Sequence, residues 1–392
     1  MHVGLPWYGE AGAIGSDGRR SGPGCCRLIG IGTALPPTRV PNSEIESFLD
    51  TSDEWIQTRT GIRERRVAEA GLTLVELASR AARAALQAAG VEASAVDAVI
   101  CSSSSPDATF PSLACRVQAE LALPHGPAFD IQAACSGAIY GMAVAQAMIQ
   151  GGLCRTVLVV AAEIFSRVLD WNDRSTAVLF GDGAGALVVG GPDQAGAEIL
   201  GLDLGADGGG AWALDTIRFQ VAEADKDRPA PAYTTADRAL DRVVHMDGRE
   251  VFRFSTKILE QIVHRLSGAA GIQPDQISLI VPHQANSRIL ATAAGRLGLP
   301  SDRFSCNVDR LGNTSSASIP LALAEADREG RCHDGELICL VAFGAGLTWG
   351  GALLRWQPTG VIIDDRAELG ETSNLPIAGA GTRSQDGEEA SG

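Results

Sequence analysis

Residues 129–141, FDIQAACSGAIYG, place a cysteine between a short apolar strand and a helix of small residues. The helical pattern continues to residue 152 through alanine, glycine and apolar side chains. Strands that lead through small-residue turns into helices are typical of layered α/β folds. This stretch therefore predicts both the class of the fold and a thiol at one of its strand-to-helix junctions.

The thiol of Cys135 is the reactive group in this stretch. Free backbone N–H groups at a helix N-terminus and the helix dipole favour a thiolate, and they lower the pKa of a cysteine from about 8.5 to roughly 3.5–7.5. Small neighbours leave room for a substrate beside the sulfur. We therefore expect a nucleophile at Cys135, and the competing interpretation is a cysteine that only packs in the core.

Two pairs of segments repeat the same order of features. Residues 74–106 and 249–287 both run from an amphipathic helix through a glycine into an apolar strand, and 180–191 and 343–356 are both Gly-rich turns that lead into apolar strands. Repeated patterns of this kind indicate an internal duplication. Continuous apolar runs such as TVLVVAAE and ELICLVAFG suit strands buried on both faces of a sheet. The sequence thus predicts an α/β fold of two duplicated halves, with helices on both faces of the sheet.

The chain of 392 residues is long enough for two domains or for one large duplicated unit. Residues 1–24 and 359–392 are rich in glycine and show no hydrophobic period, so we predict disordered tails at both ends. The repeats divide the rest into an N-terminal half, 25–200, and a C-terminal half, 201–358.

Composition excludes several classes of function. A net charge of −15 argues against nucleic acid as a partner. The nine cysteines form no C-x-x-C pair and no Cys/His ligand spacing, so no metal site is expected. The segment GDGAGA lacks the pattern of a dinucleotide-binding loop and is interpreted as a structural turn. Without a leader pattern or a long apolar run, we expect a cytoplasmic protein that does not enter a membrane and has reduced thiols.

A nucleophilic thiol needs partner groups, and the second half of the chain offers two. His283 directly follows an apolar strand in LIVPHQANSRI, and Asn313 lies in a Gly/Ser/Thr loop that opens a helix in NVDRLGNTSSASIPLAL. Each has an ordinary structural explanation, namely a histidine satisfied at a strand end and an asparagine in a turn. If the halves are duplicated, their equivalent strand ends can meet at one pocket.

Five short motifs, AACSGA, PHQAN, GNTSSASIP, FGDGAGA and FGAGLTWGGALL, resemble the signature set of β-ketoacyl-acyl-carrier-protein synthase III, a family of thiolase-fold condensing enzymes. Residues 51–65, TSDEWIQTRTGIRER, resemble the coenzyme A-binding segment of the same family. The resemblance runs from Arg27 to Trp356. It implies a thiolase-like fold with a five-layer αβαβα core, a homodimer, no permanently bound cofactor, and a coenzyme A thioester as substrate.

The resemblance also implies roles for the three candidate residues. Cys135 would accept an acyl group from a coenzyme A thioester. His283 and Asn313 would hold the thioester carbonyl of a malonyl-carrier protein while it loses CO₂, because neutral donors stabilise a forming enolate. The backbone N–H groups of Cys135 and Ala345 would bind the tetrahedral oxyanion. The family has glycine at the position of Ala345, and alanine is disfavoured at positive φ.

Further residues match the family's binding positions. Those expected to contact coenzyme A are Thr51, Trp55, Arg59, Arg174 and Arg288. A basic patch of Arg288 and Arg296 would attract an acidic carrier protein, although Arg296 also suits a solvated helix face. Phe110 matches the residue that closes the acyl pocket across the dimer interface, and core packing is the competing interpretation. Trp212 and the loop 206–245 are expected to shape the entrance.

Two functions remain open from the sequence. The first is acyl transfer to Cys135 followed by decarboxylative Claisen condensation, which starts a fatty acid or polyketide chain. The second is transfer of the acyl group to a hydroxyl or amine of a small-molecule acceptor without condensation. An intact Asn313 favours the first, because simple transfer needs no donor for an enolate. The complete Cys/His/Asn set argues against a catalytically inactive subunit, and the acyl primer stays open.

Overall fold

The computed structural model describes residues 25–215, 218–219, 240–241 and 244–366. Its centre is a ten-stranded sheet in which β16 pairs with β1 beside the main path. In spatial order the strands of that path are β13 (Leu279–Pro282), β14 (Leu337–Gly344), β15 (Thr348–Arg355), β8 (Ala197–Ala206), β1 (Arg27–Leu35), β7 (Gly183–Gly190), β6 (Thr156–Glu163), β4 (Ala98–Ser102) and β5 (Ala128–Ile131).

The sheet consists of two halves with the same strand order. In the first half, β4 and β6 are parallel, β7 is antiparallel to β6, and β1 is antiparallel to β7. In the second half, β13, β14, β15 and β8 repeat these directions. A single parallel bridge between Ile280 and Phe304 stands where β5 stands in the first half. The halves join where β1 pairs with β8, at Arg27–Glu198 and Leu28–Ala197. The repeated strand directions confirm the duplication predicted from the sequence.

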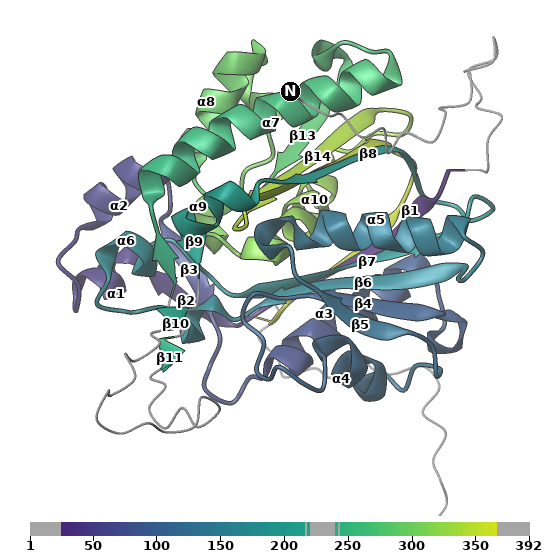
Figure 1. Cartoon of the computed structure of the whole chain (residues 1–392), viewed down its shortest axis with the longest axis horizontal. Helices are drawn as coiled ribbons and strands as arrows, with labels where there is room; N and C mark the ends of the chain where they lie inside the picture. The colour runs from purple at the N-terminus through teal and green to yellow at the C-terminus, as the bar shows by residue number, and fades with distance from the viewer. Residues whose placement is uncertain (1–24, 216–217, 220–239, 242–243, 367–392) are drawn as a thin grey trace, which may run out of the picture.

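Helices cover both halves and also separate them, which gives five layers (Figure 1). On one outer face, α3 (Leu74–Ala89) and α4 (Leu113–Glu120) pack on the first half of the sheet. On the other, α7 (Gly248–Ala270) packs on the second half and carries α8 (Ser287–Leu297). Between them, α5 (Gly137–Gln150) and α10 (Ser318–Arg328) contact strands of both halves. The predicted αβαβα arrangement is therefore present.

The repeated helices begin and end for the same local reasons. The side chain of Thr73 caps α3 and that of Asp247 caps α7, each by accepting a backbone N–H of the first turn. Both helices end at a left-handed glycine, Gly90 with φ 62° and Gly271 with φ 70°. A short 3₁₀ turn and then β4 or β13 follow at the same spacing in each half. The repeat therefore rests on caps and turns as well as on apolar periodicity.

The remaining elements lie around this core. The short strands pair as β2 (Thr38–Pro41) with β3 (Glu64–Val67), β9 (Leu214–Asp215) with β12 (His245–Met246), and β10 (Arg218–Phe219) with β11 (Leu240–Asp241). The short α-helices are α1 (Asn42–Glu46), α2 (Asp53–Thr60), α6 (Arg174–Ala177) and α9 (Val308–Leu311). The 3₁₀ helices are η1 (Ala93–Ala95), η2 (Ala134–Ser136), η3 (Phe165–Arg167), η4 (Gly208–Ala213), η5 (Pro274–Gln276), η6 (Ser301–Arg303) and η7 (Ser315–Ala317).

Two predicted boundaries were wrong. The division at residues 200/201 falls inside β8, which begins at Ala197 and belongs to the second half. The tail predicted for 359–392 starts too early, because residues Gly360–Asp365 form β16. The rest of that tail from residue 367, and the predicted N-terminal tail 1–24, lie outside the described residues.

The strand β16 is held by pairing, packing and charge. It pairs in parallel with β1 from Gly30–Gly360 to Leu35–Asp365. It also lies so close to α3 that a Cβ on Gly360 would be 1.8 Å from the carbonyl oxygen of Ala88. Its last two residues, Asp364 and Asp365, form buried ion pairs with Arg80 and Arg66.

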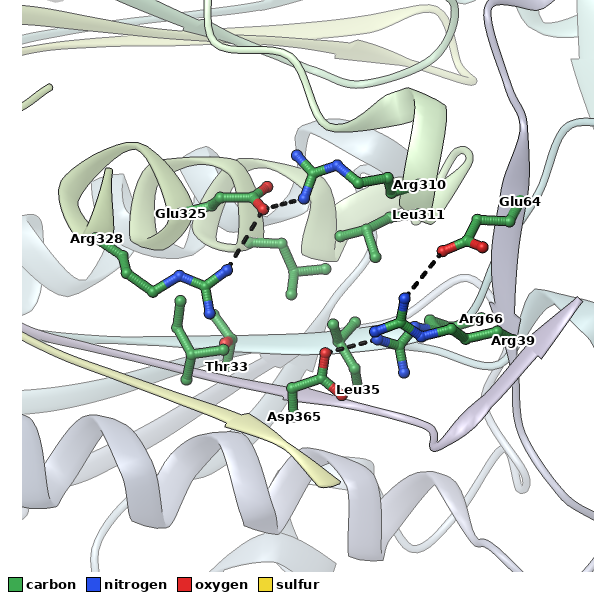
Figure 2. Close-up of a pocket in the computed structure, with 12 residues that line it drawn as sticks. Thr33, Leu35, Arg39, Glu64, Arg66, Arg310, Leu311, Glu325, Arg328 and Asp365 are labelled. Atoms are coloured by element: carbon green, nitrogen blue, oxygen red, sulfur yellow. Dashed lines mark hydrogen bonds and ion pairs between the residues drawn. The ribbon is translucent and has the colours of Figure 1, made fainter. Parts of the chain in front are cut away.

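A small cavity of about 100 Å³ lies beside the end of β16 (Figure 2). Figure 2 shows Asp365 turned toward Arg66, and their side chains are 2.6 Å apart. The other arginines that line the cavity are paired as well, Arg39 with Glu64, and both Arg310 and Arg328 with Glu325. Because each of these four arginines is paired with one of three carboxylates, this cavity is part of the framework that seats β16.

Among the described residues, no helix is both long and apolar enough to cross a membrane.

Candidate active site

Three side chains that are far apart in the sequence line one cavity of about 190 Å³, and they are Cys135, His283 and Asn313. Cys135 lies in η2 at the start of α5, His283 directly follows β13, and Asn313 lies between α9 and η7. The cavity extends to Arg59 and Thr60 on α2, and much of its remaining wall is apolar. The convergence expected from the duplication is therefore present.

The turn at Cys135 has a counterpart in the second half. Ala134, the first residue of η2, has φ 45°, and Ser315, the first residue of η7, has φ 48°. Gly344 lies close to the cysteine, because a Cβ there would be 2.7 Å from the backbone nitrogen of Cys135. The absence of a side chain at residue 344 thus lets the end of β14 approach the nucleophile.

The electrostatic environment of Cys135 differs from the sequence-based expectation. The side chain is 5% exposed, and burial raises the pKa of the thiol to about 12. A hydrogen bond with Ser315 and one with the backbone of Cys135 lower this pKa, whereas the charge of Glu163 raises it further. The predicted lowering of the pKa by the helix N-terminus was therefore wrong, because loss of hydration outweighs it.

His283 is buried and neutral. Burial lowers the pKa of His283 to about 3, so the imidazole carries no charge at neutral pH. Its Nδ1 lies 2.6 Å from Oγ of Ser318, and its ring meets Phe343 edge-on. The backbone N–H of Gln284 donates to the same Ser318 oxygen, which leaves the hydroxyl hydrogen available for Nδ1. In that arrangement the proton of the neutral ring resides on Nε2.

One of the two polar groups of the Asn313 amide is hydrogen-bonded within the protein. Its Oδ1 accepts a hydrogen bond of 2.9 Å from the backbone N–H of Ser315. The Nδ2 group is left as the donor on this side chain, which is 7% exposed and lines the cavity. The backbone on both sides is fixed, because Asn313 N donates to Leu179 O at 2.8 Å and Gly181 N donates to Asn313 O at 3.1 Å.

The turn at residues 344–346 accommodates an alanine. Gly346 takes the positive φ of this turn, at 132°, and Ala345 does not have a positive φ. The strain expected for alanine at this position is therefore absent. The hydroxyl of Thr348 links the turn to the cysteine loop, because its oxygen lies 3.0 Å from the carbonyl oxygen of Ala345 and 2.9 Å from that of Ala133, and its one hydrogen is shared between them.

Of the residues predicted to contact coenzyme A, Arg59 lines the cavity, and Trp55 and Arg174 lie beside it. The guanidinium groups of Arg174 and Arg59 lie 4.9 Å and 6.0 Å from the centre of the Trp55 ring. Asn286 donates to the carbonyl oxygen of Arg59, which joins α2 to the start of α8. Arg288 is exposed and lies over Phe252. Thr51 has a buried hydroxyl without a hydrogen-bond partner among the described residues.

Three predicted positions lie apart from Cys135. Phe110 is 84% exposed and does not line the cavity. Arg296 is exposed but pairs with Glu260 at 2.7 Å, so part of its charge is neutralised. Trp212 is 62% exposed, and much of the loop 206–245 lies outside the described residues. Of the described residues at the ends of this loop, Leu214 and Met246 line the cavity.

Sequence reasoning missed the polar groups behind the nucleophile. Ser315 lies 3.4 Å from the sulfur of Cys135, and Glu163 is completely buried at the end of β6. One signal for Glu163 was available, since an acidic residue ends an otherwise apolar strand at the position that Gly344 occupies in the second half.

The comparisons with known proteins agree with this geometry. The family model of 3-oxoacyl-[acyl-carrier-protein] synthase III matches residues 129–208, and the model of its C-terminal part matches residues 268–356. The β-ketoacyl-[acyl-carrier-protein] synthase III of Caldanaerobacter subterraneus subsp. tengcongensis is 43% identical over 330 residues, which cover 84% of this chain and 97% of that protein.

Solved structures show the same relationship. The 3-oxoacyl-[acyl-carrier-protein] synthase III of Aquifex aeolicus VF5 has a TM-score of 0.75 and 40% identity, with 84% of this chain and 100% of that chain covered. The priming β-ketosynthase of the R1128 polyketide biosynthetic pathway has a TM-score of 0.75 and 35% identity, with 87% and 99% covered. The chain therefore belongs to the β-ketoacyl-[acyl-carrier-protein] synthase III family, and it is an acyl-transferring condensing enzyme with a thiolase-like fold.

Proposed function

We propose that this protein transfers an acyl group from acyl-coenzyme A to Cys135 and then condenses it with malonyl-acyl-carrier protein, which starts a fatty acid or polyketide chain. One observation carries the proposal, namely that Asn313 and His283 each keep one N–H donor free. The oxygen of the Asn313 amide is hydrogen-bonded and its Nδ2 is free, and Nδ1 of His283 is hydrogen-bonded and its Nε2 is free. Two neutral N–H donors beside a thiol suit an enolate, which needs charge stabilisation and no proton acceptor.

In the first half-reaction, the thiol of Cys135 loses its proton to solvent, and the resulting thiolate attacks the thioester carbonyl of acyl-coenzyme A. The backbone N–H groups of Cys135 and Ala345 stabilise the tetrahedral oxyanion. Collapse of this intermediate forms the acyl-Cys135 thioester and releases coenzyme A as a thiolate. The coenzyme A thiolate takes a proton from water after it leaves the site.

In the second half-reaction, the thioester carbonyl of malonyl-carrier protein accepts hydrogen bonds from His283 and Asn313. Cleavage of the bond to the carboxylate releases CO₂ and leaves an enolate on that carbonyl, where the two donors stabilise its charge. The enolate carbon attacks the acyl-Cys135 carbonyl. The thiolate of Cys135 leaves, and the product is a 3-ketoacyl-carrier protein.

The residues near Arg59 suggest how the substrates would bind as they enter the cavity. The Trp55 ring and the guanidinium groups of Arg59 and Arg174 offer an aromatic face and positive charge, which suit the base and phosphates of a nucleotide. Thr51 lies four residues before Trp55, and binding of the substrate through its buried hydroxyl would require that hydroxyl to become accessible. Arg288, with Arg296 as a partly neutralised neighbour, supplies positive charge for an acidic carrier protein.

The proposal includes a homodimer in the cytoplasm with no permanently bound cofactor. Phe110 lies on a surface loop and is 84% exposed, which is unusual for a large aromatic side chain. This exposure supports burial of the ring against a second copy of the chain. In that dimer, Phe110 would close the acyl pocket of the partner and limit the length of the primer.

The alternative is transfer of the acyl group from Cys135 to a hydroxyl or amine of a small molecule. A two-stage assay separates the two functions. The protein is incubated with acetyl-, branched, malonyl- or aryl-coenzyme A and its intact mass is measured, and malonyl-carrier protein is then added. Condensation predicts a mass gain that Cys135→Ala abolishes and Cys115→Ala preserves, followed by CO₂ release and a 3-ketoacyl product. An acyl group that leaves only to a hydroxyl or amine acceptor would refute condensation.

Replacing Phe110 with alanine is expected to admit longer acyl groups, because a smaller side chain deepens the pocket of the partner subunit. The measurement is acylation of Cys135 by a series of acyl-coenzyme A thioesters of increasing length. The matched control is Phe48→Ala, another exposed ring that does not line the cavity of Cys135. An unchanged chain-length preference in Phe110→Ala would remove the assignment.

A further inference from the structure

Ser318 is, among the described residues, the hydrogen-bond partner of the His283 ring. It is the first residue of α10 and has no exposed surface, and its Oγ lies 2.6 Å from Nδ1 of the imidazole. The two residues are 35 positions apart in the sequence and meet because α10 packs against β13. The ring that serves the condensation is therefore held from behind by a buried hydroxyl.

The surroundings of Ser318 set the direction of this hydrogen bond. A serine hydroxyl has one hydrogen to donate, and in the described part of the chain Nδ1 of His283 is the group placed to accept it. The other hydrogen bond of the same oxygen is one that it accepts, from the backbone N–H of Gln284 at 3.4 Å. If Nδ1 carried the ring proton, the buried hydroxyl hydrogen would lose its acceptor, which disfavours that tautomer by about 5- to 150-fold.

The equivalent contact in the first half has no side chain from the helix. Gly137 begins α5 as Ser318 begins α10, and Ser102 and His283 stand at the same spacing after the glycines that end α3 and α7. A Cβ on Gly137 would lie 1.7 Å from Oγ of Ser102, so a side chain there would collide with it. The duplicated fold therefore brings this helix position against the residue at the strand end, and the second half uses it for a hydrogen bond.

The turn that leads into α10 also orients the second donor of the site. The backbone N–H of Ser315 donates to Oδ1 of Asn313 at 2.9 Å, so the amide has Nδ2 left for the cavity that it lines. The turn is fixed to the first half of the fold by Ser316, whose hydroxyl donates to the carboxylate of Glu163 at 2.6 Å. One anchored turn thus occupies the acceptor atom of the amide, and the helix that follows it occupies the acceptor atom of the imidazole.

We propose that Ser318 is a positioning residue that holds His283 as a hydrogen-bond donor toward the cavity. By donating to Nδ1, its hydroxyl keeps the ring proton on Nε2 and fixes the plane of the ring, which Phe343 also meets edge-on. Ser318 itself does not line the cavity. The inference rests on the proposed function only in assigning Nε2–H to the enolate of the malonyl thioester.

The first test is the tautomer of His283 at pH 7, read by NMR from protein labelled with ¹⁵N-histidine. A ring nitrogen with a proton and one without give well-separated signals, and exchange between tautomers averages them. The chain has six histidines, and His283→Ala identifies the signals of residue 283. The wild-type protein is expected to show a protonated Nε2 and an unprotonated Nδ1. Ser318→Ala should move both signals toward their average, because alanine removes the donor to Nδ1.

The second test is kinetic. Ser318→Ala should slow decarboxylative condensation by about tenfold, the cost of one lost hydrogen bond to the ring. Acylation of Cys135 should be nearly unchanged, because His283 donates in the second half-reaction. In a His283→Ala background, the same substitution should cause no further loss, since Ser318 acts through the ring. A merely structural role for the hydroxyl predicts instead that the two losses multiply.

Ser305→Ala is the matched control. Ser305 is also a buried serine, and its hydroxyl donates to the carbonyl oxygen of Ala322 on α10 rather than to His283. It should keep both the wild-type signals and the wild-type rate of condensation. A proton on Nδ1 in the wild-type protein, unchanged signals in Ser318→Ala, or a further loss in the His283→Ala background would each overturn the proposal. If Ser318→Ala fails to fold, the wild-type signals decide.

Because the NMR signals need no acyl substrate, their outcome is separable from the proposed function. The expected signals in a protein that does not condense malonyl-carrier protein would leave the role of Ser318 and remove the condensation. Condensation by the wild-type protein, together with unchanged signals in Ser318→Ala, would do the reverse.

Discussion

Replacing Asn313 with alanine should lower the rate of decarboxylative condensation by about 10²- to 10³-fold, the usual cost of removing one donor to a developing oxyanion. Acylation of Cys135 should be nearly unaffected, because the amide donates only to the enolate formed in the second half-reaction. The side chain lines the cavity with its oxygen tied to Ser315 and its nitrogen available, so alanine removes the donor.

The two half-reactions are measured separately on the same protein. Acylation is followed by intact mass with acyl-coenzyme A alone, and decarboxylation by CO₂ release from malonyl-carrier protein. His283→Ala should show the same separation, and the double variant should lose less than the product of the single losses, because both donors serve one oxygen. Asn172→Ala, which removes an exposed amide bonded to Asp170, is the control. Equal losses in both half-reactions of Asn313→Ala would contradict the assigned role.

Much of the fold could be predicted because its determinants are local and occur twice. The left-handed glycines at residues 90 and 271, followed at equal spacing by β4 and β13, are visible in the sequence as a repeat. The strand β16 has no such signal. Its six residues are anchored by Arg80 and Arg66, which precede their partners by 284 and 299 positions. Contacts of that range are set by the tertiary fold and leave no local pattern.

Some properties of the candidate site could likewise be predicted from the sequence, and others could not. The identities of Cys135, His283 and Asn313 could be predicted, because each stands at a strand or helix end within a distinctive motif. The protonation of the site could not, because it depends on how deeply the fold buries each group. A helix N-terminus alone favours a thiolate, yet burial reverses the direction for Cys135. Likewise, Ser316 and Glu163 were visible as residues, but the hydrogen bond of 2.6 Å between them depends on two halves meeting.

Replacing Asp364 with asparagine is expected to destabilise the protein by about 3–5 kcal/mol, the cost of leaving one charge of a buried ion pair without its partner. The Nε of Arg80 lies 2.7 Å from the carboxylate, and the two side chains are 4% and 5% exposed. Asparagine keeps the shape and one acceptor oxygen but removes the charge. Arg80 would then remain buried between α3 and β16 with neutral acceptors alone, namely the amide oxygen at residue 364 and the backbone carbonyl oxygens of residues 35 and 364.

The measurement is the midpoint of urea unfolding, together with hydrogen exchange of the β16 amides. The control is Asp193→Asn, which breaks a pair with Arg155 of similar length, 2.6 Å, whose side chains are 63% and 78% exposed. Exposed pairs contribute at most about 1 kcal/mol, so this variant should unfold near the wild-type midpoint. If β16 detaches before the core unfolds, the loss appears as faster exchange at residues 360–365, and the global loss is limited to the free energy of detachment. An unchanged midpoint with unchanged exchange in Asp364→Asn would show that pairing with β1 and packing on α3 hold β16 without the ion pair.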